Sequence, residues 1–423
     1  MRHVPTLLRE NREFRQLFAA DAISLIGDQI TLIALPLTAV LVLDAGPAEM
    51  GYLGAAGLLP YLLFSLHAGA WVDRRGGRRQ KMIAADLGRA VVVASVPVAY
   101  GLDVLTIEQL FVTEFVVGSL AVVFRVCQPT LFISVVPREG YVEGQSLMNG
   151  ARAFSFVAGP SAGGVLVQAL TAPVALVLDA CSYVSSALFL RSISPEEPPT
   201  AEPARGHVVS GLRFIFGSPV IRSSLAATAT VNFFNFVFWA LFVLYVTREL
   251  DVPPGTLGLV LGAGAIGGLV GSVVTGRIGR RIGLGPAFMA GCVLFPLPLV
   301  LVPLAEGPRW VIVSLLFSAE FLSGLGVMML DISAGAIFAA LIPDRLRSRV
   351  SGAYSFVNYG VRPLGSLVGG ALGSTIGLRP TLWIGAVGAL AGVLWLLPSP
   401  IPRLRDLPEP EDGNGAVLAG ERA

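Results

Sequence analysis

Long apolar runs separated by short polar connections cover most of the chain. An α-helix needs about 20 apolar residues to cross a bilayer, and twelve runs come close to that length or exceed it. The pattern therefore predicts an all-α membrane protein with twelve transmembrane helices. The predicted spans are 14–43, 51–72, 82–101, 106–136, 146–170, 172–191, 221–247, 255–276, 284–304, 308–341, 346–377 and 381–398.

The second half of the chain repeats the first at an offset of about 206 or 207 residues. The matching positions are Pro137 with Pro343, Gly159, Gly163 and Gly164 with Gly365, Gly369 and Gly370, and Gly69, Arg74 and Gly76 with Gly276, Arg281 and Gly283. Parallel repeats of six spans are typical of transporters built from two halves. We therefore predict pseudo-symmetric six-helix bundles at 1–192 and 219–400, a cytoplasmic linker at 193–218 and a disordered cytoplasmic tail at 401–423.

Composition and charge agree with a membrane protein. With 54% hydrophobic and 14% charged residues, the chain is too apolar for an ordinary soluble fold, and its net charge of +2 is too small to indicate a nucleic-acid partner. Basic residues gather in the connections on one side of the predicted membrane, among them Arg138, Arg277 and Arg347. The positive-inside rule then places both termini in the cytoplasm of a multi-pass inner (plasma) membrane protein. We expect no cleavable signal peptide, because the first apolar run is too long for one.

The polar stretch between the second and third spans carries a specific pattern, formed by Gly69, Asp73, Arg74, Gly76 and Arg78. It resembles the loop signature G-x-x-x-D-R-x-G-R-R of the major facilitator superfamily, with Gly77 in place of the first late arginine. The resemblance implies a conformational latch, in which Asp73 meets the positive N-terminal end of span 11 and helps to close the cytoplasmic side. Basic residues that serve only topology are the alternative.

Two further motifs resemble exporters of this superfamily. Gly159, Pro160, Gly163 and Gly164 in span 5 match the G-P-x-x-G-G core of an antiporter signature, although general packing of small residues is an alternative. The segment 125–129 is similar to the R-x-x-Q-G element of the fourth helix, with proline in place of glycine. The segments 14–15, 24–28, 34–36 and 136–139 indicate the bacterial branch of macrolide-efflux and enterobactin-exporter proteins.

Ionisable side chains inside the spans are the candidate chemistry, because they are costly in a bilayer and usually face a cavity or a partner. We expect a central cavity for substrate and protons, lined by Asp28, Glu114, Arg125, Asn235, Glu320, Asp331 and Arg362. Glu114 and Arg125 occupy the repeat positions of Glu320 and Asp331. The alternative is that these groups pair across helices and lock the structure. We interpret Asp86, Asp179 and Arg152 as interfacial or packing residues, and His67 as packing.

Within this set, Asp28 is our candidate for the proton-coupling carboxylate. It lies near the middle of span 1, a helix that borders the central cavity in the superfamily that the chain resembles. Burial disfavours the charged form of a carboxyl group, so such a group can bind a proton from one side and release it to the other. We also expect Arg125 and Asp331 to approach each other when the halves close.

These observations predict a secondary active transporter that exports a hydrophobic or amphipathic small molecule, such as a drug, antibiotic or siderophore, by proton antiport. Proton-coupled uptake of a solute and a non-transporting membrane sensor or assembly partner are the alternatives. No nucleophile–base or metal-ligand spacing suggests an enzyme, and we expect no cofactor or metal. The expected partners are the small-molecule substrate, protons and the lipid bilayer, with no nucleic acid, and we expect a monomer.

Overall fold

The computed structural model describes residues 6–194 and 207–405, with side chains described except at 65–71, 73–75, 207–211, 344–345 and 348. The described part is helical from end to end and contains no strand. Its first helices are α1 (Thr6–Glu10), α2 (Arg12–Leu41), α3 (Pro47–Arg75), α4 (Arg78–Gly101), α5 (Ile107–Val135), α6 (Tyr141–Leu170) and α7 (Ala172–Arg191). The helix α8 (His207–Gly217) lies within the predicted linker. It is followed by α9 (Pro219–Arg248), α10 (Pro254–Ile282), α11 (Leu284–Leu294), α12 (Arg309–Leu341), α13 (Asp344–Ile376) and α14 (Leu378–Leu390).

Ten helical segments in the described part are long and apolar enough to cross a membrane. Three of them gain length from short 3₁₀ turns: Arg138–Gly140 before α6, Leu297–Leu301 after α11 and Ala391–Trp395 after α14. The helices α3 and α13 are 29 and 33 residues long and bring each half to six long helices. The prediction of an all-α membrane fold is confirmed. The exact limits of the halves, linker and tail stay predictions, and 195–206 and 406–423 lie outside the described residues.

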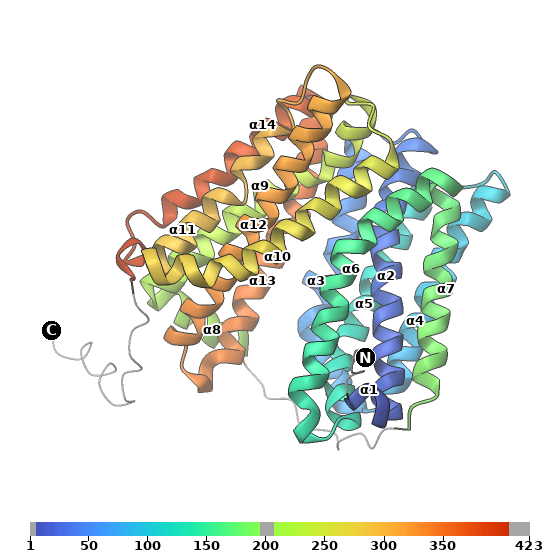
Figure 1. Ribbon diagram of the computed structural model, residues 1–423, viewed down its shortest axis with the longest axis horizontal. Helices are drawn as coiled ribbons and strands as arrows, with labels where there is room; N and C mark the ends of the chain where they lie inside the picture. Colours follow the sequence, from blue (N-terminus) through green and yellow to red (C-terminus); the bar gives the residue numbers. More distant parts are fainter. Residues whose placement is uncertain (1–5, 195–206, 406–423) are drawn as a thin grey trace.

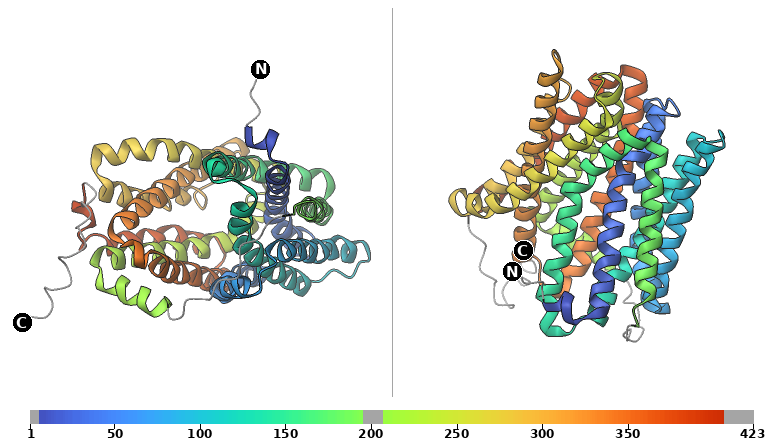
Figure 2. Two further views of the ribbon diagram at one scale, coloured as in Figure 1. Left: turned by 90° about the horizontal axis from the view of Figure 1, so that it is seen from below. Right: turned by 45° about the vertical axis from the view of Figure 1, so that its right-hand side comes forward.

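The long helices form two bundles that meet at one end and separate toward the other (Figure 1). The helices α2 to α7 make one bundle and α9 to α14 the other, and α1 and α8 both lie toward the separated end. Figure 2 shows the same arrangement from two further directions. We call the two ends the converging end and the diverging end. The connections α3–α4 and α10–α11, which carry the repeated Gly-Arg pattern, lie at the diverging end.

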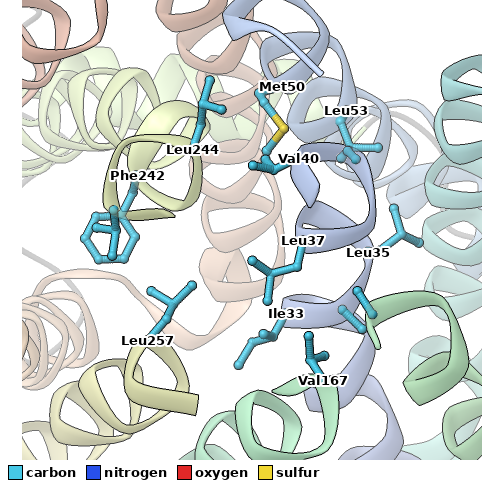
Figure 3. Packing of buried hydrophobic residues seen from close by; sticks show 14 of the residues in the cluster. Ile33, Leu35, Leu37, Val40, Met50, Leu53, Val167, Phe242, Leu244 and Leu257 are labelled. Carbon is cyan, nitrogen blue, oxygen red and sulfur yellow. The ribbon is translucent and has the colours of Figure 1, made fainter. Parts of the chain in front are cut away.

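Apolar side chains from both bundles join into one core at the converging end (Figure 3). Ile33 and Leu37 of α2 lie beside Val167 of α6, and Phe242 of α9 and Leu257 of α10 come from the other bundle. Inside a membrane, close van der Waals contact rather than escape from water holds helices together. This shared core therefore holds the two halves together at the converging end.

Two helix pairs carry the junction between the halves, and the repeat relates them to each other. In the pair α6–α10, Gly164 faces Gly258, and in the pair α3–α13, Gly370 faces Gly51. A Cβ atom on Gly164 would meet the carbonyl oxygen of Pro254 at 2.4 Å, and one on Gly51 would meet the Cα atom of Gly370 at 2.7 Å. Only glycine allows the backbones to come this close.

Candidate transport site

The centre of the first bundle holds a buried arginine surrounded by acidic and aromatic groups. Arg89 of α4 is 2% exposed, and its Nη1 lies 3.4 Å from Oδ1 of Asp28 in α2. Its Nη2 donates to Asp86, one helical turn away. The guanidinium also lies 4.2 Å from the ring centroid of Tyr183 and 4.9 Å from that of Phe124. Helices α2, α4, α5 and α7 therefore converge on a single cation.

Hydrogen bonds accepted by two carboxylates, those of Asp28 and Asp179, surround this arginine. We call the group formed by Asp28, Asp86, Arg89, Asp179 and Tyr183 the Arg89 cluster. The Tyr183 hydroxyl donates to Oδ1 of Asp28 at 2.6 Å. The Asp179 carboxylate accepts hydrogen bonds from Thr31 and from Ser182, the latter at 3.0 Å. Among the described residues, Oδ2 of Asp86 and Nε of Arg89 are buried without a hydrogen-bond partner.

Charge does not balance inside the Arg89 cluster. Asp28 and Asp86 both pair with one guanidinium, and a third carboxyl group, that of Asp179, interacts with it electrostatically. Asp86 and Asp179 are both fully buried. Burying an uncompensated charge is so costly that a buried group usually gives it up by binding or releasing a proton. Asp28, which is 33% exposed, is the carboxyl group of the cluster with the most access to the surroundings. The cluster therefore combines buried carboxyl groups with one, Asp28, that remains accessible.

The sequence identified only part of this cluster. Asp28 was a predicted site residue, whereas Asp86 and Asp179 were interpreted as packing residues, and Arg89 was missed. Burial and hydrogen bonds agree with a packing role, because Asp86 accepts from Arg89 and Asp179 accepts from Thr31 of the neighbouring helix α2. A signal was available in the spacing of Asp86 and Arg89, which lie on one face of a helix in the middle of an apolar run.

Glu114 and Glu320 occupy equivalent places in the two bundles. The carboxylate of Glu114 in α5 lies over Gly57 of α3, where a Cβ atom would meet Oε2 at 2.7 Å. The carboxylate of Glu320 in α12 lies over Gly264 of α10, with the corresponding distance 3.1 Å. Glu320 is buried, and its Oε1 has no hydrogen-bond partner among the described residues. The repeat predicted from the sequence thus extends to the surroundings of a buried acid.

Arg125 and Arg362 lie on aromatic rings near the middle of the molecule. The guanidinium of Arg125 in α5 is 5.5 Å from the ring centroid of Tyr61 in α3. That of Arg362 in α13 is 4.4 Å from the centroid of Tyr359 and 5.3 Å from that of Phe236. The two tyrosine rings stack on each other across the junction of the halves, with centroids 6.2 Å apart.

The remaining predicted cavity residues are in the second bundle. Asp331 of α12 is exposed and interacts electrostatically with Arg362. No ion pair joins Arg125 and Asp331 in the described part of the chain, where Arg125 lies over Tyr61 instead. Asn235 of α9 is buried, and its Oδ1 has no hydrogen-bond partner among the described atoms.

Asp21, which sequence reasoning also missed, extends the acidic face of α2. It lies two helical turns before Asp28, is 4% exposed and accepts a hydrogen bond of 2.7 Å from Gln128 of α5. Near it, a cavity of about 470 Å³ opens between α2 and α6. Apolar side chains dominate its walls, which include Phe18, Ile26 and Phe154. A flat hydrophobic molecule fits such walls better than a strongly hydrated one.

The latch prediction falls largely outside the described side chains. Gly69, Asp73 and Arg74 lie on α3, but only their backbone is described, so the latch stays a prediction. The backbone of the turn between α3 and α4 is described. Gly76 and Gly77 connect α3 to α4 with φ angles of 56° and 62°, a conformation that favours glycine. Gly77 stands where the signature has arginine, and Arg78, at the start of α4, is buried.

The motif in span 5 lies on α6 and serves two contacts. Gly159 and Gly163 face α2, where added Cβ atoms would meet the side chain of Gln29 and the backbone of Ile30. Gly164 faces α10 of the other bundle. Pro160 interrupts the hydrogen-bond ladder beside them, and its carbonyl oxygen would meet a Cβ atom on Gly258 at 2.4 Å. The motif therefore sets how closely α6 approaches both neighbours.

Comparison with known proteins agrees with this architecture. The family model of the Major Facilitator Superfamily matches residues 17–360 and 224–420. Two solved structures share the fold: a bacterial homologue of the iron transporter ferroportin in the inward-facing state (TM-score 0.75, 17% identity, 93% of this chain and 99% of that chain) and the nucleoside transporter NupG (TM-score 0.72, 13% identity, 91% and 98%). The chain belongs to the Major Facilitator Superfamily and is a multi-pass membrane protein.

Among curated relatives, the chain is 28% identical over 405 residues to the multidrug efflux pump Tap of Mycolicibacterium fortuitum, covering 90% of this chain and 93% of that protein. Tap of Mycobacterium tuberculosis is 28% identical over 382 residues, covering 84% and 85%. An uncharacterized transporter of this type from Bacillus subtilis, YfiS, is 24% identical over 410 residues, covering 94% and 96%. The predicted resemblance to an efflux branch of the superfamily is confirmed.

Proposed function

We propose that the protein exports a hydrophobic or amphipathic small molecule across the cell membrane in exchange for protons. Relatives named as multidrug efflux pumps, which match 84–90% of the chain, support export. The single observation that supports proton coupling is the Arg89 cluster, in which the partly exposed Asp28 and the buried Asp86 both pair with one buried cation.

The proposed orientation places the diverging end in the cytoplasm. The connections at that end carry most of the basic residues, which favours the cytoplasmic side. Cargo would enter between the separated halves, while the shared core closes the converging end toward the outside. Rocking of one half against the other would then expose the same site to the outside.

The chemistry of coupling follows from the neighbours of Asp28. When Asp28 is ionised, Arg89 and the Tyr183 hydroxyl stabilise it. A proton that arrives from the outside neutralises Asp28 and weakens its attraction to Arg89, so that Arg89 interacts more strongly with Asp86. Release of the proton to the cytoplasm restores the original contacts. The side chain of Asp28 thus connects proton binding to the positions of α2 and α4.

Accumulation of dyes in everted membrane vesicles tests the direction of transport. Vesicles that contain the protein and are acidified inside should accumulate an amphipathic aromatic dye such as fluorescein, and a protonophore should abolish the accumulation. Vesicles with the Asp28→Asn variant should accumulate no dye above the protein-free level. Accumulation only in right-side-out cells or vesicles would indicate uptake, and no flux in either preparation would contradict a transporter.

A further inference from the structure

A row of four side chains crosses the junction between the halves: Arg125, Tyr61, Tyr359 and Arg362. Arg125 and Tyr61 come from α5 and α3 of the first half, and Tyr359 and Arg362 come from α13 of the second. Each guanidinium lies over the nearer tyrosine, at 5.5 Å and 4.4 Å, and the tyrosine planes are inclined by only 23°. The row therefore presents two stacked rings with a cation at each end.

The row carries more positive than negative charge. Neither arginine makes an ion pair in the described part of the chain, and Nε of Arg362 is buried there without a hydrogen-bond partner. Asp331 is the carboxylate that acts electrostatically on Arg362, and the buried Asp21 of α2 acts electrostatically on Arg125 without contacting it. Glu114 shares a helix with Arg125 but lies eleven residues away, or about 16 Å along the axis.

Aromatic rings do not neutralise these cations. A cation–π contact stabilises a guanidinium but leaves its full charge in place and most of its hydrogen-bond donors unused. Arg125 and Tyr359 are also accessible, the tyrosine being 38% exposed. Two guanidiniums with free donors beside accessible ring faces match a ligand that is both planar and anionic, because guanidinium pairs with carboxylate-like groups through two parallel hydrogen bonds.

We propose that Arg125 and Arg362 bind an acidic group on a planar, aromatic cargo, whose ring rests against Tyr61 and Tyr359. The inference depends on the proposed export function and narrows its substrate to anionic or zwitterionic aromatic molecules. One cation belongs to each half, so the bound anion bridges the halves at mid-depth. A cationic aromatic molecule meets repulsion at both ends of the row. The headgroup of an anionic lipid offers the same charge without the planar ring.

Binding of two dyes with one scaffold and opposite charge tests the proposal. The purified full-length protein is placed in phosphatidylcholine nanodiscs, and fluorescence anisotropy measures its affinity for fluorescein, an anionic xanthene, and rhodamine 123, a cationic xanthene. Fluorescein should bind at least tenfold more tightly. Arg125→Gln and Arg362→Gln should each weaken fluorescein binding roughly tenfold, since a hydrogen bond to a charged group contributes about 1.5–3 kcal/mol.

Control variants separate the contributions. Arg125→Lys and Arg362→Lys keep the charge and should retain more affinity than the glutamine variants, whereas Tyr61→Leu should weaken binding of the ring without reversing the charge preference. Arg309→Gln, at an exposed arginine at the start of α12, should leave binding unchanged. Monodisperse elution of each variant shows that it is folded. If a glutamine variant is not folded, the lysine variant at the same position is used to test the proposal.

Three results would overturn the proposal: equal or tighter binding of rhodamine 123, unchanged fluorescein affinity in the folded arginine variants, or loss of fluorescein binding in nanodiscs that contain phosphatidylglycerol. The last result would assign the arginines to a lipid headgroup. The assay uses no proton gradient, so it is independent of the vesicle experiment. Absence of gradient-driven flux would contradict the proposed function while leaving the binding result in place.

Discussion

At the scale of single residues, Arg89 is the side chain on which the first bundle depends most. It is buried among Asp28, Asp86, Tyr183 and Phe124, and helices α2, α4, α5 and α7 each contribute one of its contacts or the residue itself. Removing one partner of a buried ion pair leaves an uncompensated charge and costs about 3–5 kcal/mol. The coupling energy of a buried ion pair is therefore best measured by comparing variants that lack one partner with a variant that lacks both.

We expect Arg89→Gln to lower the free energy of unfolding by about 3–5 kcal/mol, because Asp86 and Asp28 lose their cation. The double variant Arg89→Gln with Asp86→Asn should lose less than the sum of the single changes, since the second change removes the charge left unpaired. Denaturant unfolding in lipid bicelles measures both values. Arg309→Gln is the control at an exposed arginine. Strictly additive losses would show that Arg89 and Asp86 are not coupled.

At the scale of helices, glycine contacts determine how closely the halves approach at the converging end. The contacts Gly164–Gly258 and Gly51–Gly370 are related by the repeat, so the proposed rocking of the halves would open both together. Helix α6 also contains a glycine without such a neighbour: a Cβ atom on Gly150 would meet nothing within 4 Å. The same substitution at the two positions therefore compares a crowded site with an open one on one helix.

Gly164→Ala should destabilise the converged arrangement by about 1–3 kcal/mol, the usual cost of overpacking, whereas Gly150→Ala should not. A difference of this size shifts the ratio of the two states roughly 5- to 150-fold. Spin labels at exposed Leu102 and Leu304, which lie in the connections α4–α5 and α11–α12 at the converging end, report the separation by pulsed electron paramagnetic resonance. Identical distance distributions in the two variants would contradict this role for Gly164.

An ion pair at the same end should matter much less. Arg248 of α9 pairs with Asp44, which follows α2, and its Nη2 also lies 3.3 Å from the carbonyl oxygen of Val40. The Asp44 side chain is 94% exposed, and exposed ion pairs contribute about 0.2–1 kcal/mol. Asp44→Asn should therefore change the spin-label distances far less than Gly164→Ala does. A larger effect from Asp44→Asn would show that charge, rather than close helix contact, holds this end together.

At the scale of the whole molecule, the sequence predicted those features of the fold that depend on long segments of the chain. Apolar runs predicted the helices, and the recurrence of glycines at a near-constant offset predicted equivalent halves. The equivalence reaches Glu114 over Gly57 and Glu320 over Gly264. The two halves differ at the predicted cavity for substrate and protons, because Arg125 and Asp331 occupy equivalent positions and carry opposite charges.

The contacts of the candidate site could not be predicted from the sequence. The Arg89 cluster joins α2, α4 and α7, whose contributing residues lie up to 155 positions apart. A helix that is apolar on every side gives no periodicity that shows which face meets which neighbour. For the same reason, the stacking of Tyr61 on Tyr359 was invisible, although the helices that carry them were predicted. Single polar residues were found, but their partners were not.

The central claim is that Asp28 couples proton movement to export. Proteoliposomes with an imposed pH gradient, loaded with a pH-sensitive dye, can report proton flux and cargo flux in the same sample. We expect cargo addition to start proton movement in the opposite direction with the unmodified protein. With Asp28→Asn, which keeps hydrogen bonding but cannot carry the proton, cargo-induced proton flux should vanish while downhill exchange of cargo continues. Normal uphill pumping by the Asp28→Asn protein would contradict the account.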